Sequence, residues 1–245
     1  MKMRNLLISI AIKYQGNYFK IEKAIKNNEK INDKIPIQKA ITILDKQYPK
    51  QLLDLEYPPF VLFYKGDINL LNNDLIAVVG ARNYSEYGKS CTIDIVERLS
   101  KHYVIVSGLA KGIDSIAHKH AKKTIAVLGN GLNYYYPYEN KNLYQYLQEN
   151  QLVISEYPLN VKPKKYHFPF RNRIIAALCK SIIVTEASYK SGTMLTVNEG
   201  LTLNRNIYAV PFGYNEMVNC GTNILIQQGA NILTKENIND LFDKL

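Results

Sequence analysis

The residues best suited to chemistry in this sequence are glycines and basic side chains that follow short apolar runs. Gly80, Gly108, Gly129 and Gly213 each come where a predicted strand ends. Glycine lets backbone N–H groups approach an anion closely, and the helix that follows adds the partial positive charge of its first turn. Because ligands of open α/β sheets bind outside the carboxyl ends of the strands, we predict a phosphate-binding rim there.

Two of these loops carry basic residues that can contact phosphate. Arg82 lies two residues after Gly80, just beyond a predicted buried strand, and a guanidinium at that place can form two parallel hydrogen bonds with a phosphate. The alternative is a surface ion pair with Glu86. Lys111 lies in the second loop, and we expect it to touch phosphate as well. Asp114 and His118 share a helix face beyond it, but no nucleophile accompanies them. We therefore expect Asp114 to stabilise the helix start and His118 to pack beside it.

A third loop combines rings with positive charge. Between Glu156 and Glu186 the chain has six basic residues and no acidic one. Rings that stack on bases and cations that hold the backbone are typical of grooves for single-stranded nucleic acid. Phe168 or Phe170 would supply the stacking ring, and at least one of them is expected in the core. The basic residues nearest these rings are Lys165, Arg171 and Arg173.

The fourth loop contains Ser191, Gly192 and Thr193. Either hydroxyl can cap the following helix and leave N–H groups for an anion. The G-x-S-x-G pattern of a hydrolase nucleophile is absent, so Ser191 is not expected to attack a substrate.

Three enzyme classes conflict with the spacing of these residues: P-loop NTPases, nicotinamide or flavin enzymes, and phosphoribohydrolases. Gly88-Lys89-Ser90 resembles part of a P-loop, but Asn83 stands where that motif needs glycine. The dinucleotide fingerprint G-x-G-x-x-G is missing too. A phosphoribohydrolase would need G-T-x-x-E, and Thr196 occupies the position of the glutamate, which is the main acid/base group. A nucleotide-cleaving enzyme and a non-catalytic nucleotide sensor remain the alternatives to a DNA-binding protein.

Short apolar runs alternate with amphipathic segments from residue 75 onward. Strands without in/out alternation, separated by helices, indicate a parallel sheet covered on both faces. We therefore predict an α/β fold, an extended Rossmann-like, doubly wound and mostly parallel sheet. The expected strands are 76–79, 103–106, 124–128, 152–155, 182–185, 207–210 and 231–233. The expected helices are 86–101, 113–122, 141–149, 173–179, 193–203 and 222–228.

The amino-terminal part has a different pattern. Residues 1–35 predict two short helices around Gly16 and Asn17, and residues 41–70 predict an irregular connector with one strand at 61–64. We place a domain boundary near Asn72–Asn73. This gives a small helical region with its connector at 1–72 and the Rossmann-like domain at 73–245.

Composition limits the class of protein further. The chain has 245 residues, 47% of them hydrophobic and 21% charged, close to globular averages. Its net charge of +10 favours an anionic partner such as nucleic acid. Three widely spaced cysteines form no C-x-x-C pair, which indicates no disulfide framework and no zinc site and fits the cytoplasm. We expect no metal, no cofactor and no membrane segment, since the apolar runs are short.

Taken together, these motifs resemble the DNA-processing protein A family (DprA, also called Smf). The resemblance covers residues 41–233 and is specific because the matching blocks are numerous and in order. They are 76–82 (IAVVGAR), 107–114 (SGLAKGID), 126–131 (AVLGNG), 155–158 (SEYP), 167–175 (HFPFRNRII), 191–193 (SGT) and 221–223 (GTN).

The resemblance implies a cytoplasmic, homodimeric protein that binds single-stranded DNA and is not an enzyme. Members protect incoming DNA in natural transformation and help load the RecA recombinase onto it. By position, Arg82 matches the family's pocket arginine, and Lys165 and Phe168 match its lysine and stacking phenylalanine. Lys141 matches a basic contact of some members. Many members have a larger amino-terminal helical domain, of which we expect only a short version before Asn72. Many also have a carboxy-terminal winged helix, which we expect to be missing here.

Overall fold

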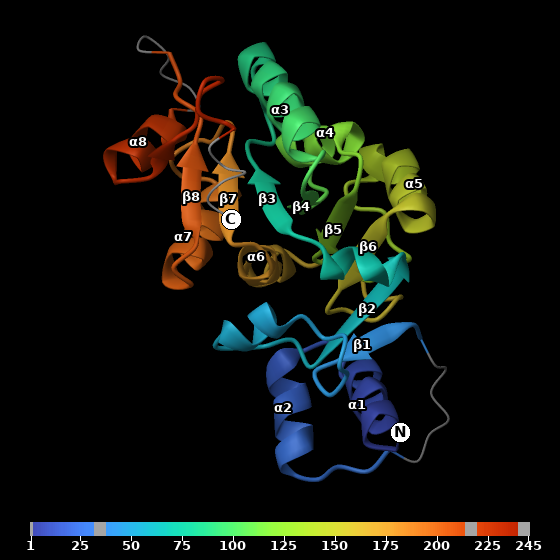
Figure 1. The fold of residues 1–245 in the computed structure, drawn as a ribbon. Coiled ribbons are helices and arrows are strands. Elements are labelled where there is room, and N and C mark those ends of the chain that lie inside the picture. The colour runs from blue at the N-terminus through green and yellow to red at the C-terminus, as the bar shows by residue number, and fades with distance from the viewer. Residues whose placement is uncertain (1, 32–37, 214–219, 240–245) are drawn as a thin grey trace.

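A single nine-stranded sheet organises the computed structural model, which describes residues 2–31, 38–213 and 220–239 (Figure 1). The strand order is β1-β2-β6-β5-β4-β3-β7-β8-β9. Strands β6 through β9 in this order pair in parallel, whereas β2 pairs antiparallel with β1 and with β6. The strands are β1 Ala40–Thr42, β2 Val61–Gly66, β3 Leu75–Val79, β4 Val104–Ser107, β5 Thr124–Leu128, β6 Leu152–Ser155, β7 Ser181–Val184, β8 Asn206–Ala209 and β9 Asn231–Ile232.

The central strands are apolar on both faces because helices cover both faces. In β3 all five residues are buried. Ile76 and Val78 pack in one cluster with α3 and α4, while Ala77 and Val79 pack in another with α6 and α7. Figure 1 shows α3, α4 and α5 grouped on one side, apart from α7 and α8. This arrangement confirms the expected doubly wound, mostly parallel sheet.

The helices join the strands in the predicted alternation. They are α1 Lys2–Lys13, α2 Tyr18–Lys26, α3 Glu86–Leu99, α4 Ile113–His120, α5 Lys141–Asn150, α6 His167–Leu178, α7 Gly192–Thr202 and α8 Gly221–Gln227. Short 3-10 turns are η1 Lys50–Asp54, η2 Ile68–Asn72 and η3 Tyr138–Asn140. None of the helices in the described ranges is long and apolar enough to cross a membrane.

Helix α6 differs most from its prediction, because it begins at His167 rather than at residue 173. Pro169 falls in its first turn, where proline is tolerated since the N–H groups there have no partner within the helix. The segment predicted as a fixed loop therefore becomes the first turns of a helix, and Phe168 and Arg171 project from it.

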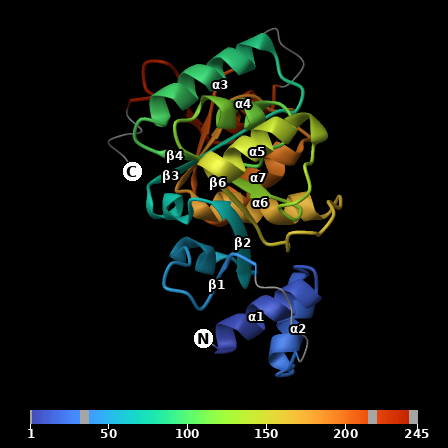
Figure 2. The same cartoon turned by 90° about the vertical axis from the view of Figure 1, so that its right-hand side faces the viewer.

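The amino-terminal helices lie together at one end of the molecule, beyond β1 and β2 (Figure 2). Arg4 on α1 pairs with Asp45 at 2.9 Å and donates to the carbonyl of Ala40 at 2.6 Å. Strand β2 adds this region to the main sheet through its pairing with β6. The division of the chain into domains near Asn72–Asn73 stays a prediction.

Candidate nucleic-acid interface

The loops that follow β3 and β7 meet at the point where the chain reverses its direction across the sheet. From β3 the connections run toward β4, and from β7 they run toward β8. The N–H of Ala81 donates to the carbonyl of Glu186 at 2.8 Å. Thr193 Oγ1 donates to the carbonyl of Gly80 at 2.9 Å. The two loops are thus held together at the place where open α/β sheets bind ligands.

A side chain of the protein itself occupies the first turn of α3. The carboxylate of Glu186, fully buried, accepts hydrogen bonds from the N–H and Oγ of Ser85 at 3.0 Å. A Cβ on Gly88 would collide with Oε2 of Glu186, so glycine is required there. A helix N-terminus that already holds a carboxylate has no room for a phosphate. This arrangement gives a physical reason why the P-loop-like residues 88–90 are not a P-loop.

The start of α7 is open by contrast. Gly192 is exposed, and a Cβ on it would meet nothing within 4 Å. Ser191 occupies the N-cap position, but its Oγ makes no hydrogen bond within the described residues. Thr193 faces inward and uses its hydroxyl on Gly80. Of the three residues predicted here, Ser191 and Gly192 thus leave polar groups unused at a helix start.

Arg82 and Lys111 lie on the loops after β3 and β4, and both are exposed. Gly112, at φ +90°, lets these loops approach, since a Cβ on it would lie 2.7 Å from Cα of Arg82. Arg82 does not pair with Glu86, which instead binds Lys89 at 3.0 Å. Within the described ranges, no acidic side chain forms an ion pair with Arg82 or Lys111.

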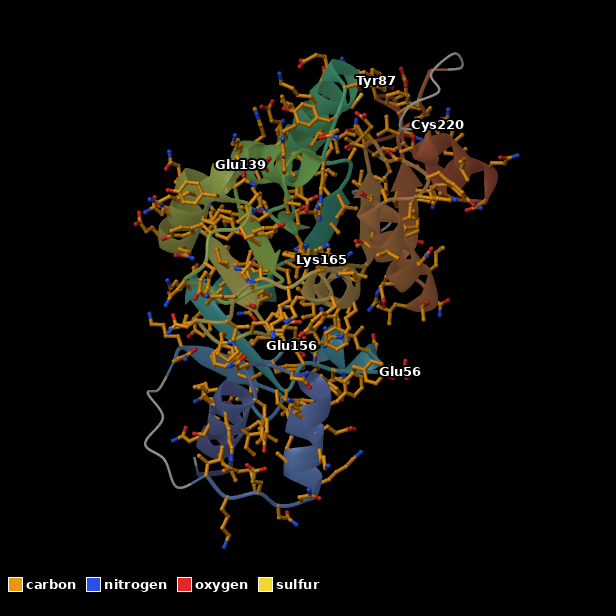
Figure 3. The ribbon with its side chains drawn as sticks, turned by 180° about the vertical axis from the view of Figure 1, so that it is seen from behind. Glu56, Tyr87, Glu139, Glu156, Lys165 and Cys220 are labelled. Atoms are coloured by element: carbon orange, nitrogen blue, oxygen red, sulfur yellow. The ribbon has the colours of Figure 1, made fainter. Side chains whose placement is uncertain are left out.

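Phe168 and Lys165 come from the start of α6 and the loop before it. Phe168 is half-buried, and its ring packs over Gly129, where a Cβ would lie 2.8 Å from Cδ1. The Tyr136 ring lies 5.3 Å from it at an angle of 31°. Lys165 is exposed, and Figure 3 places it near α6. Phe170 instead packs at 3.7 Å under the guanidinium of Arg173.

His167 holds the first turn of α6 in place. Its ring stacks on Tyr157 at 3.9 Å and 19°, and its Nδ1 lies 3.1 Å from the carbonyl of Gly129. Burial lowers the pKa of His167 to about 4, so the imidazole is neutral at physiological pH. Phe168 is therefore presented from a rigid turn.

Arg171 and Arg173, predicted as DNA contacts, lie inside the protein. Arg171 is 5% exposed and donates to the carbonyls of Gly108, at 2.8 Å, and Val127. Arg173 is 4% exposed and forms a two-pronged ion pair with Glu156 at 2.8 and 2.9 Å. Since buried charges need internal partners, both guanidinium groups are already used. Their geometry fits a role in anchoring α6 rather than one in binding phosphate.

Asp114 and His118 have the structural roles that we expected. The carboxylate of Asp114 accepts from the N–H of Gly108 at 3.1 Å. Burial raises the pKa of Asp114, and the positive charge of nearby Arg171 offsets part of this rise. His118 Nδ1 lies 2.7 Å from Oγ1 of Thr124, and burial lowers the pKa of His118 to about 3. The two side chains are enclosed, so they do not form an accessible acid/base pair.

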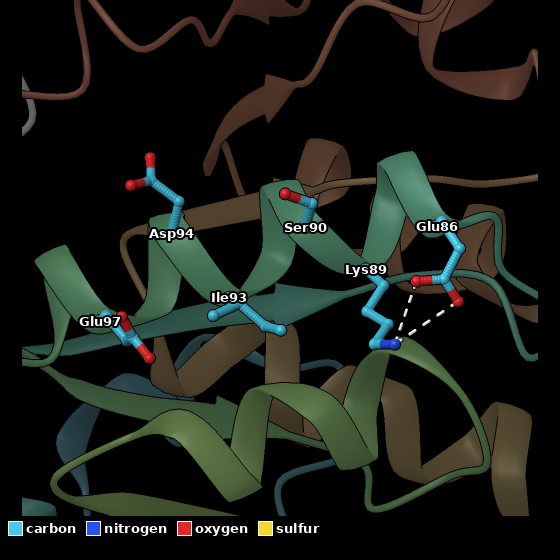
Figure 4. Close-up of a pocket in the computed structure, with 6 residues that line it drawn as sticks. All are labelled: Glu86, Lys89, Ser90, Ile93, Asp94 and Glu97. Carbon is cyan, nitrogen blue, oxygen red and sulfur yellow. Dashed lines mark hydrogen bonds and ion pairs between the residues drawn. The ribbon is translucent and has the colours of Figure 1, made fainter.

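A surface hollow of about 340 Å³ along α3 is too acidic to extend this basic edge (Figure 4). It is lined by Glu86, Lys89, Ser90, Ile93, Asp94 and Glu97. Lys89, the cation in this hollow, is paired with Glu86. Within the described part of the chain there is also no cluster of side chains suited to hold a metal ion.

Three exposed tyrosines at the same edge were not singled out from the sequence. Tyr136 and Tyr138 follow β5, and Tyr166 directly precedes α6. Lys141, predicted as a basic contact, places its Nζ 5.7 Å from the centre of the Tyr138 ring. The run of tyrosines at 134–136 was a visible signal, but periodicity does not tell a core ring from an exposed one.

The fold and this edge define a doubly wound α/β protein with a basic, aromatic rim and an open helix start. A family model for DNA recombination-mediator protein A matches residues 39–245. The chain belongs to this family.

Sequence identity to several DprA and Smf proteins supports this assignment. The chain is 42% identical over 202 residues to DNA processing protein DprA of Streptococcus pneumoniae, covering 81% of this chain and 70% of that protein. It is 42% identical over 170 residues to protein Smf of Escherichia coli, covering 67% of this chain and 46% of that protein. It spans 60% of the Bacillus subtilis DprA, to which it is 41% identical over 178 residues, 70% of this chain.

Two solved structures share the fold. The X-ray structure of DprA from Streptococcus pneumoniae superposes with a TM-score of 0.80 at 40% identity, covering 93% of this chain and 80% of that one. DNA processing protein A from Helicobacter pylori, described as having a unique single-stranded DNA binding mode, superposes with a TM-score of 0.78 at 32% identity. That match covers 84% of this chain and 97% of the other.

Proposed function

We propose that this protein binds single-stranded DNA along the carboxyl edge of its sheet. Arg82 and Lys165 hold phosphates, and a base stacks on Phe168. The observation that carries this proposal is that Arg82 and Lys165 are both exposed, without acidic partners among the described residues, on the loops that follow β3 and β6, while the half-buried ring of Phe168 stands at the start of α6. The single-stranded DNA binding described for the Helicobacter pylori relative supports it.

The open start of α7 and the neighbouring loops would hold the rest of the backbone. Ser191, Gly192 and Thr193 offer backbone N–H groups to a phosphate, whereas the Oγ of Ser191 is buried. Gly80 brings the β3 loop close to them. Lys111 lies on the loop after β4, Lys141 lies at the start of α5, and both add positive charge. Arg171 and Arg173 support the site by anchoring α6.

The first experiment compares single- and double-stranded DNA of one length across a salt series. A stacking pocket needs exposed base faces, so we expect a clear preference for the single strand. Arg82→Ala removes one phosphate contact, so affinity falls and the salt slope shrinks by about 0.7. Phe168→Ala weakens binding by about 1–3 kcal/mol for the lost base contact, with the slope nearly unchanged.

Lys123→Ala is the matched control, because Lys123 is exposed directly before β5, at the opposite edge of the sheet. It should alter binding and salt slope much less than Arg82→Ala. Equal affinity of the wild-type protein for both DNA forms would overturn the pocket in favour of plain charge attraction.

In the cell, we propose a role in DNA processing during natural transformation and recombination. The protein would act in the cytoplasm as a homodimer that protects incoming single strands and helps load RecA. The family membership and the names of its relatives support this role. The test measures RecA ATPase on single-stranded DNA coated with a single-strand-binding protein, with and without this protein. Sedimentation at several concentrations tests the dimer.

We propose further that the protein is not an enzyme. Thr196 on α7 is buried and provides a hydroxyl where a phosphoribohydrolase needs a carboxylate. Incubation with AMP followed by chromatography should yield no adenine. Release of adenine that is lost in Arg82→Ala would instead support the nucleotide-cleaving alternative, and tight AMP binding without turnover would support a nucleotide sensor.

A further inference from the structure

Three tyrosine rings on the connections after β5 and β6 are exposed. Tyr136 is 45% exposed, Tyr138 69% and Tyr166 60%. They belong to the connections after β5 and β6, which are neighbouring parallel strands. Burying a tyrosine ring is favourable, and exposed rings gathered at one place mark a surface that another molecule covers.

Each of these rings lies beside a partner suited to nucleic acid. Tyr136 lies against Phe168 at 5.3 Å and 31°, so the two rings form a continuous aromatic surface. Lys141 Nζ lies 5.7 Å from the Tyr138 ring, and Lys164 Nζ lies 5.9 Å from the Tyr166 ring. A ring with an adjacent ammonium group can stack on a base and bind the neighbouring phosphate together.

Side-chain hydrogen bonds hold the loop that carries Tyr136 and Tyr138 in place. Tyr144 on α5 donates its hydroxyl hydrogen to the carbonyl of Tyr136. Asn130 Nδ2 donates to the carbonyl of Tyr134 at 2.9 Å, and Asn140 Nδ2 donates to that of Leu109 at 3.1 Å. A loop fixed in this way loses little conformational entropy when a ligand binds, so its rings are prepared for stacking.

We propose that Tyr136, Tyr138 and Tyr166 form a stacking track that carries the bases of single-stranded DNA beyond Phe168. This inference rests on the proposed function and extends it, because it assigns a direction to the bound DNA. The DNA strand leaves Phe168 and runs over the carboxyl ends of β5 and β6. Lys141 and Lys164 bind the phosphates along that path.

The first test compares a short and a long oligo-dT, of about 4 and about 16 nucleotides, the two ends of the site sizes of single-strand-binding folds. The double variant Tyr138→Leu/Tyr166→Leu should bind the short oligonucleotide like the wild type. It should lose at least about fivefold in affinity for the long one, which corresponds to about 1 kcal/mol or more of stacking. Tyr138→Phe/Tyr166→Phe keeps the rings and should restore the affinity.

Tyr146→Leu is the control, since Tyr146 is 51% exposed on α5 but lies outside the proposed track. It should leave both affinities unchanged. Equal losses for the short and the long oligonucleotide in the double variant would point to a disturbed fold and overturn the track. Wild-type affinity of the double variant for the long oligonucleotide would overturn it as well.

A second test uses Glu139, the acidic residue that follows Tyr138. Glu139 is exposed beside Tyr138, so a DNA strand on the track passes close to its charge. Glu139→Gln should therefore raise affinity for the long oligonucleotide and not for the short one. Damage to the fold does not produce such a gain. An unchanged affinity would place the DNA elsewhere, whereas a wild-type protein that binds neither oligonucleotide would contradict the proposed function itself.

Discussion

Helices α3 and α7 follow neighbouring strands, and both begin near a glycine. The first turn of α3 is occupied by a side chain, however, whereas the first turn of α7 is open. At α3 the buried carboxylate of Glu186 occupies the turn and leaves no space for a side chain on Gly88. At α7 nothing lies within 4 Å of the place where a side chain on Gly192 would begin.

The contrast teaches that a glycine at a helix start has two possible causes. Gly88 is glycine because the folded chain itself needs the space. The folded chain makes no such demand at Gly192, where the proposed function would need the close approach of a DNA phosphate. A sequence motif does not separate the two cases; the contents of the helix turn do.

The largest expected effect is the loss of stability when the Glu186 carboxylate is removed from the first turn of α3. Glu186→Ala leaves the N–H of Ser85 without its charged acceptor, and hydrogen bonds to charged groups contribute about 1.5–3 kcal/mol. We expect the free energy of unfolding, measured with urea, to fall by about 3 kcal/mol. Ser191→Ala at the open turn should change it by less than about 0.5 kcal/mol, because its Oγ has no hydrogen-bond partner in the described residues. Similar losses in both variants would remove the distinction.

A smaller effect follows from adding one methyl group to each turn. Gly88→Ala forces the new Cβ against Glu186 and should cost about 1–3 kcal/mol of stability, the usual range for overpacking. Gly192→Ala has open space and should leave stability unchanged or slightly higher. If Gly192→Ala also leaves affinity for oligo-dT unchanged, phosphate does not approach that glycine.

The smallest expected effect separates stability from binding at the open turn. Gly192→Asp places a negative charge at a helix start, which favours folding by about 0.3–1 kcal/mol. The same charge repels a phosphate, so affinity for oligo-dT should fall while the thermal midpoint stays or rises. Gly192→Asn is the uncharged control and should keep more of the affinity. A variant with higher stability and unchanged DNA affinity would exclude a phosphate at α7.

The sheet was largely predictable from sequence, because strands such as β3 have apolar residues throughout and are bounded by turn residues. Strand β1 was missed since three residues carry no periodic signal, and its pairing with β2 is a long-range contact. The predicted start of α6 is six residues too late, because prolines such as Pro169 are common in loops, although a first helical turn accepts proline as well.

The DNA contacts themselves stay a prediction, but the exposure of three of the predicted basic residues follows from their place after a strand. Arg82, Lys111 and Lys165 are exposed at the expected edge. Arg171 and Arg173 share their charge and their neighbourhood in sequence, yet their side chains lie inside. Whether an arginine on a short basic helix faces solvent depends on which partners the fold brings to it, such as Glu156, and those partners are remote in sequence.

Strand β2 has a consequence for how this protein can be divided. It covers the outer edge of β6, whose residues Leu152–Ser155 are all buried. A fragment that begins at residue 73 would leave unpaired those backbone N–H and C=O groups of β6 that face β2, although the pairing with β5 would remain. Unprotected edges of this kind recruit strands from other molecules. Truncation at that point would therefore turn a covered strand into a template for aggregation, whereas a fragment that keeps β2 would not.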